Sequence, residues 1–195
     1  MSSSESLKNI KKARKEFISY TMFALSSAEL KRVLDSCSDM SDYIMILLAS
    51  RYGFRREDIV NIKVSDINLQ QSTLTYYEEK KDRTRTIPIE SDVVIELKRY
   101  IGTIPGNQKT LLKITDGSSA WNHFQKLCAI AGVSVPPGRT GRPFHSLRGT
   151  CVKMRQKQGW TNNEVAALIG DDPGTVAKHY ATTSPGELAD KMRGI

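Results

Sequence analysis

The sequence predicts a mainly α-helical fold with a small antiparallel β-sheet (α+β). Three observations lead to this prediction: helix-capping sequences precede apolar segments, an apolar run of helical length ends at a glycine, and strand-forming residues flank one charged turn. Capping residues and apolar runs indicate helices, whereas β-branched and aromatic residues around a short polar turn indicate a hairpin. With 195 residues, the chain is long enough to bury a full core.

The first helix is expected after Ser26, because Ser26 can cap it while Glu29 completes a capping box. A second helix is expected over the apolar run 43–49 and should end at Gly53, since glycine readily adopts the left-handed conformation that closes a helix. Arg55 would then lie in the turn that follows this helix.

A β-hairpin is predicted over the strand-like segments 72–77 and 84–89, with a charged turn at 79–83. Lys80 and Lys81 lie in that turn. Without further information, both lysines are equally consistent with a solvated hairpin tip.

Helical periodicity returns at 91–101 and 118–131, where Leu97, Phe124 and Leu127 are expected core residues. The Pro- and Gly-rich stretch 136–143 is expected to be a loop, and it contains Arg139 and Arg142.

The next helix, 144–158, carries His145 and Arg148 three residues apart on one face, near a helix N-terminus that favours bound phosphate. Thr161 and Glu164 then form a capping box for a helix that ends at Gly170.

Composition is consistent with a nucleic-acid partner. The formal charge is +8 and the isoelectric point is about 9.4, so phosphates are an expected ligand, although a basic surface alone does not require one. Cys37, Cys128 and Cys151 have no disulfide or zinc spacing and are expected to be core thiols. No metal, cofactor or membrane span is predicted, and the expected location is the cytoplasm, or the nucleus of a eukaryotic host.

Five side chains together supply the chemistry for cutting a phosphodiester: two cations for the phosphate oxygens, a nucleophilic oxygen, and groups that move protons. They are Arg55, Lys80, His145, Arg148 and Tyr180. No one of them is specific, because the chain has 29 Lys and Arg residues and seven tyrosines. The signal lies in their order and in the motifs around them.

These motifs resemble those of the tyrosine recombinases, the phage-type integrases. The segment 52–59 resembles the first-arginine motif of that family, 145–148 matches its His-x-x-Arg box, and 168–180 resembles its closing segment with the tyrosine. The intervals from Arg148 to Tyr180 fit without an insertion, and the resemblance runs from about Leu25 to the C-terminus.

The resemblance implies the tyrosine recombinase catalytic-domain fold and an enzyme that cleaves and rejoins double-stranded DNA through a 3′-phosphotyrosine at Tyr180. It implies that Arg55 and Arg148 stabilise the transition state and that Lys80, or as the alternative Lys81, protonates the leaving oxygen. It also implies that His145 accepts or orients the tyrosine proton. It also implies a tetramer on DNA. The expected further DNA contacts are Lys81, Arg83, Arg139 and Arg142.

One position departs from the family pattern. Asp171 follows Gly170 where the family usually has a histidine or tryptophan that donates a hydrogen bond to the phosphate, and an ionised carboxylate can only accept. Three interpretations stay open. The first is a site-specific recombinase or integrase, and the second is an enzyme resembling type IB topoisomerases that relaxes DNA, which the family's chemistry allows. The third is a weakened homologue that binds DNA, for which Asp171 is the only argument.

The expected organisation is a basic polar lead, tag or linker at 1–20 and a catalytic domain at 21–195. Members of the family usually carry a separate N-terminal DNA-binding domain, for which the lead is too short. The segment from about Ser184, with Leu188 and Met192 one turn apart, is expected to dock on a neighbouring protomer or to pack on its own domain.

Overall fold

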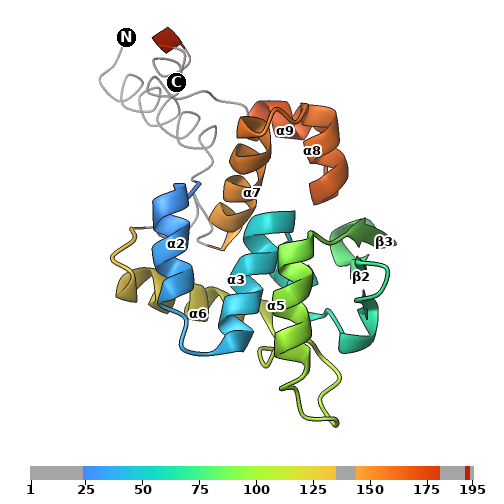
Figure 1. The fold of residues 1–195 in the computed structure, drawn as a ribbon. Coiled ribbons are helices and arrows are strands. Elements are labelled where there is room, and N and C mark those ends of the chain that lie inside the picture. The colour runs from blue at the N-terminus through green and yellow to red at the C-terminus, as the bar shows by residue number, and fades with distance from the viewer. Residues whose placement is uncertain (1–23, 135–143, 181–191, 194–195) are drawn as a thin grey trace, which may run out of the picture. The chain divides into compact units, whose positions relative to one another are not determined.

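The computed structural model describes residues 24–134, 144–180 and 192–193. It divides into two compact units, one ending at Cys151 and one beginning at Val152, with helix α7 continuing from the first into the second (Figure 1). The helices and strands of the first unit are α2 (Ser27–Asp35), α3 (Met40–Tyr52), α4 (Arg56–Val60), β1 (Ile67–Asn68), β2 (Thr73–Glu78), β3 (Arg83–Pro88), α5 (Ser91–Ile101), α6 (Gly117–Ile130) and the start of α7 (His145–Lys157).

Helix α3 is the centre of the first unit. Every residue from Ile44 to Ser50 is buried, which is the pattern of a helix covered on all sides. Helices α2, α4, α5 and α6 all contact it, and α2 and α5 can be seen beside it in Figure 1. Helix α3 is therefore the buried element around which the other helices pack.

Three antiparallel strands form the sheet, in the order β1-β2-β3. Alternate residues of β2 face the interior, namely Leu74, Tyr76 and Glu78. The Tyr76 ring meets the Phe54 ring edge-on, with 4.7 Å between centroids. This contact places β2 against the turn that follows α3.

The second unit contains the rest of α7, helix α8 (Asn162–Ile169) and helix α9 (Pro173–His179). Thr161 and Glu164 form the expected capping box of α8, and Gly170 ends that helix in the left-handed conformation, with φ 68°. Asp172 caps α9 and Pro173 is its first residue. Helices α8 and α9 pack on each other.

The predicted fold class is confirmed by these elements, and so are the capping box at Ser26 and the helix end at Gly53. Leu97, Phe124 and Leu127 are buried as expected. Among the cysteines, Cys128 and Cys151 are buried but Cys37 is only half-buried, because it follows the last turn of α2. Within the described residues, no helix is both long and apolar enough to cross a membrane.

Candidate functional site

The candidate site of the first unit begins at the C-terminal end of α3. Gly53 closes that helix with φ 68° and ψ 30°, and its amide donates to the carbonyl of Ala49 at 3.0 Å. Glycine adopts this left-handed conformation without a steric penalty. Two residues later, Arg55 is the extended N-cap of α4. Arg55 therefore lies in a short turn between two helices.

Two buried carboxylates hold the guanidinium of Arg55. Its Nη1 donates to Glu78 Oε1 at 2.5 Å and lies 3.7 Å from Asp58 Oδ2. The side chains of Glu78 and Asp58 are 0% and 3% exposed, whereas that of Arg55 is 14% exposed. The arginine is thus fixed from the interior side.

Arg148 contacts the same turn from the start of helix α7, which is distant in sequence but lies in the same unit. It is the fourth residue of α7 and is almost completely buried, and its Nη1 donates to the carbonyl oxygen of Gly53 at 2.6 Å. The partner of Arg148 is therefore only two residues from Arg55. His145 is the first residue of α7 and is half-buried.

The two carboxyl groups beside Arg55 respond differently to their surroundings. Burial raises the pKa of Asp58 above its ordinary value, and the opposing charge of Arg55 does not cancel this effect. Burial also acts to raise the pKa of Glu78, but hydrogen bonds from Arg55 and Arg83 outweigh it and hold that pKa below its ordinary value. Glu78 is therefore the firmly ionised partner of Arg55.

The hairpin carries the predicted lysines at its tip. Lys80 and Lys81 are exposed in a single 3-10 turn (Glu79–Lys81) that joins β2 to β3. Arg83, the first residue of β3, points back and donates from Nε to Glu78 Oε2 at 2.8 Å. Arg83 was expected to contact DNA; its Nε binds an internal carboxylate, while its side chain remains 47% exposed.

The remaining predicted residues lie elsewhere in the chain. Tyr180 is the C-cap of α9 in the second unit; its amide donates to the carbonyl of Val176 at 3.0 Å, and its side chain is buried. Asp171 follows α8 in the same unit, and its Oδ1 accepts from the amide of Asp172 at 3.1 Å. Arg139 and Arg142, the lead 1–20 and most of the predicted tail lie outside the described residues.

Glu78 was missed by the sequence analysis, as was the role of Asp58 beside Arg55. A signal for Glu78 was present, because it occupies the third inward position of the strand after Leu74 and Tyr76. A buried charge requires a partner of opposite sign. Alternation along β2 would therefore have indicated an internal cation near this residue.

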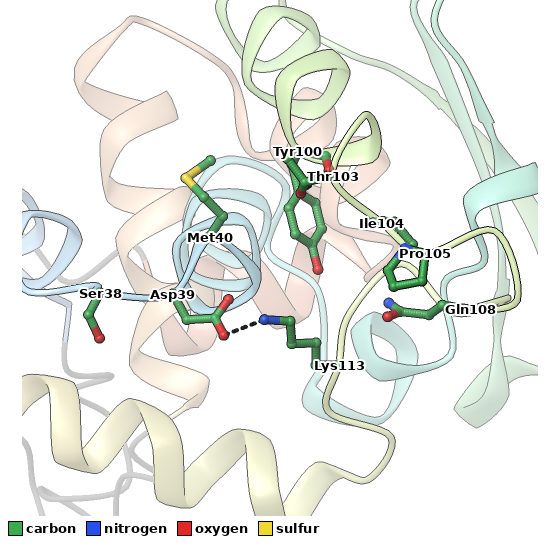
Figure 2. A pocket seen from close by; sticks show the side chains of 9 residues that line it. All are labelled: Ser38, Asp39, Met40, Tyr100, Thr103, Ile104, Pro105, Gln108 and Lys113. Atoms are coloured by element: carbon green, nitrogen blue, oxygen red, sulfur yellow. Dashed lines mark hydrogen bonds and ion pairs between the residues drawn. The ribbon is translucent and has the colours of Figure 1, made fainter.

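A separate hollow of about 360 Å³ lies at the other end of α3 (Figure 2). Asp39, the N-cap of α3, and Lys113 line it and form an ion pair at 2.7 Å, so their charges offset each other. The 13 residues of α3 separate this hollow from Gly53, a distance of about 20 Å. The hollow is therefore not part of the site around Arg55 and Arg148. Among the described residues, no group of His, Cys, Asp and Glu side chains is arranged to hold a metal ion.

Comparison with known proteins identifies the family. Residues 24–187 match the Phage integrase family along most of the chain. The chain belongs to this family. The residues that carry the earlier resemblance, from Arg55 to Tyr180, all lie within the matched range.

The relatives include tyrosine recombinase XerA of Pyrococcus horikoshii, 26% identical over 146 residues, which cover 69% of this chain and 51% of the relative. The aligned part of the chain thus spans about half the length of these curated relatives.

Two solved structures illustrate the shared fold of this integrase family. A XerA recombinase has a TM-score of 0.75 at 20% identity, with 89% of this chain and 65% of that chain covered. A lambda integrase tetramer bound to a Holliday junction has a TM-score of 0.66 at 18% identity, with 84% and 50% covered. These likenesses confirm the catalytic-domain fold predicted from the sequence.

Proposed function

We propose that this chain is a site-specific recombinase that cleaves and rejoins double-stranded DNA through a 3′-phosphotyrosine at Tyr180. The observation that carries the proposal is the convergence of Arg55 and Arg148 at one turn: Arg148 Nη1 lies 2.6 Å from the carbonyl of Gly53, two residues before Arg55. Two guanidinium groups that both act on Asp58 beside this turn suit the non-bridging oxygens of a phosphate and the charge that they gain in the transition state.

In the proposed reaction, the phenolic oxygen of Tyr180 attacks phosphorus and its proton passes to His145. The bond from phosphorus to the 5′ oxygen breaks, and Lys80 protonates that oxygen to release a 5′-hydroxyl. The phosphotyrosine retains the bond energy, so that a 5′-hydroxyl of another strand can reverse the step without ATP. Asp171 is assigned no step, because an ionised carboxylate cannot donate to the phosphate.

Strand exchange between two sites requires several active subunits on the DNA. We infer a homotetramer, supported by the similarity in fold to the lambda integrase that forms a tetramer on a Holliday junction. The basic charge of +8 supports a DNA partner through counterion release. Lys81, Arg83, Arg139 and Arg142 are the proposed phosphate contacts outside the reacting centre.

The test is a covalent-trapping experiment with a nicked suicide duplex that carries the candidate site, or with fragmented genomic DNA of the source if no site is known. The nick lets the 5′-hydroxyl strand diffuse away, so the adduct accumulates and can be counted on a denaturing gel. We expect an adduct with the native chain and at least a 10³-fold smaller yield with Tyr180→Phe. Tyr43→Phe, which removes a hydroxyl from α3, is the matched control and should form the adduct normally.

Two other outcomes have definite meanings. A shift on a native gel without any adduct would replace cleavage by DNA binding as the function of this chain. Adduct formation with relaxation of supercoiled DNA, but without junctions between two duplexes, would indicate a topoisomerase-like enzyme.

A further inference from the structure

Glu78 joins two parts of the proposed machinery that come from different elements. One carboxylate oxygen accepts from Arg55 Nη1 at 2.5 Å, and the other accepts from Arg83 Nε at 2.8 Å. Arg55 belongs to the turn between α3 and α4, whereas Arg83 begins strand β3 of the hairpin. Glu78 thus bridges the core turn and the hairpin.

The bridge lies at the base of the hairpin tip. Glu78 is the last residue of β2 and pairs in register with Arg83, and the four residues between them are the tip that carries Lys80. Lys80 itself is exposed, as are Glu79, Lys81 and Asp82. The tip therefore depends on its base for its position relative to Arg55.

Both ends of the bridge are charge-assisted hydrogen bonds, which are shorter and stronger than neutral ones. The carboxylate between them is 0% exposed and Arg55 is 14% exposed, so solvent screens the Arg55 pair only weakly, whereas the 47% exposed Arg83 meets the carboxylate from the solvent side. The backbone adds a parallel link, because the amide of Glu79 donates to Asp58 Oδ1 at 3.3 Å and Asp58 also faces Arg55. A surface ion pair would not hold a loop in this way.

We propose that Glu78 is a positioning residue that fixes Lys80 relative to Arg55, so that the proton donor and the phosphate-binding arginine reach one scissile phosphate together. The inference rests on the proposed function. Glu78 touches neither substrate nor reacting atoms in this role. It acts through Arg55 on one side and through Arg83 and the hairpin on the other.

The test compares two leaving groups in single-turnover cleavage at saturating protein. One suicide substrate has the normal 5′ oxygen at the scissile bond, and the other has sulfur in its place. A thiol has a pKa of about 8.5, far below that of an alcohol hydroxyl, so the sulfur departs without a proton donor. Loss of Lys80 positioning should therefore matter only for oxygen.

For Glu78→Gln we expect cleavage of the oxygen substrate to slow by about 10²-fold, and most of this loss to disappear with the sulfur substrate. Lys80→Ala provides the reference pattern, and DNA affinity should not fall, because the variant removes a negative charge near phosphate. Glu79→Gln is the matched control: it removes the same charge from the adjacent, exposed residue and should cleave both substrates at the native rate.

If the cleavage rate of Glu78→Gln fell by the same factor on both substrates, or did not fall, the inference would be overturned. An adduct from the native chain would still leave the proposed function intact. No adduct from the native chain would instead remove the proposed function and the inference with it. If Glu78→Gln fails to fold, Arg83→Gln decides, because it breaks only the hairpin half of the bridge at a side chain that is 47% exposed. It should show the same selective recovery with sulfur, and equal losses would again overturn the inference.

Discussion

Long-range contacts hold the two arginines of the first unit, whereas short-range contacts set the helix boundaries of the second unit. In the first unit, Arg55 meets a carboxylate 23 residues away and Arg148 meets a carbonyl 95 residues away, both in the interior. In the second unit, local contacts set the helix boundaries beside Asp171 and Tyr180: the capping box of α8, the left-handed Gly170, and the amide of Tyr180, which donates to the carbonyl of Val176. The proposed phosphate-binding residues thus depend on tertiary structure, whereas helix boundaries near the nucleophile depend on neighbouring residues.

The largest expected effect comes from removing a long-range partner. Glu78→Ala removes the carboxylate that binds the Arg55 guanidinium in the interior. We expect a loss of about 3–5 kcal/mol in the free energy of unfolding. Urea unfolding followed by tryptophan fluorescence measures it, and the chain has one tryptophan in each unit, Trp121 and Trp160. A loss below about 1 kcal/mol, typical of a surface pair, would contradict the comparison.

The next effect concerns activity. Arg148→Lys keeps the positive charge but loses the planar fork that can bind a carbonyl and a phosphate together. We expect single-turnover cleavage to fall by about 10²–10³-fold, with a smaller change in DNA affinity. Arg32→Lys, at an exposed arginine of α2, is the matched control and should leave the rate unchanged. A full rate in Arg148→Lys would show that charge alone suffices at this position.

A smaller effect is expected from a local contact in the second unit. Thr161 Oγ1 accepts from the amide of Glu164 at 3.3 Å as the cap of α8. Thr161→Ala should cost about 1 kcal/mol in the free energy of unfolding. A Trp121→Phe background leaves Trp160, adjacent to this cap, as the fluorescent probe. If Thr161→Ala cost as much as Glu78→Ala, the distinction between the two units would be lost.

The smallest expected effect is a pH dependence at the Arg55 cluster. The folded-state pKa of Glu78 lies below its ordinary value of 4.5, so its contribution to stability is present above that pH and is lost as pH falls through the folded-state value. The stability difference between the native chain and Glu78→Gln should therefore shrink below about pH 4.5. Urea unfolding from about pH 6 to about pH 3 measures this difference.

The contribution of Asp58 to stability depends on pH in the opposite direction. Because burial raises its folded-state pKa, its contribution is present at low pH and is lost as pH rises through that raised value. The same pair of measurements in an Asp58→Asn background removes this opposing contribution. A difference that grew on acidification in that background would contradict the assignment of Glu78 as the ionised partner of Arg55.

Local signals in the sequence were sufficient to predict the hairpin and helices such as α2, α3 and α8, whereas the short elements α4, β1 and α9 were not predicted. Ser26, Gly53, Thr161 and Gly170 each act within a few residues, through a cap or a left-handed turn, so the prediction needed no long-range information. The motif order from Arg55 to Tyr180 was sufficient to indicate the family, which the match over 24–187 confirms. The roles of the individual site residues stay predictions.

Only the tertiary structure decided which charges meet. Glu78 reaches Arg55 because Phe54 packs on Tyr76, and this contact sets β2 against the end of α3. Arg148 reaches Gly53 because α7 begins beside that same turn. Such pairings depend on the packing of elements that are distant in sequence, and a buried ion pair forms only where that packing brings both charges out of water together.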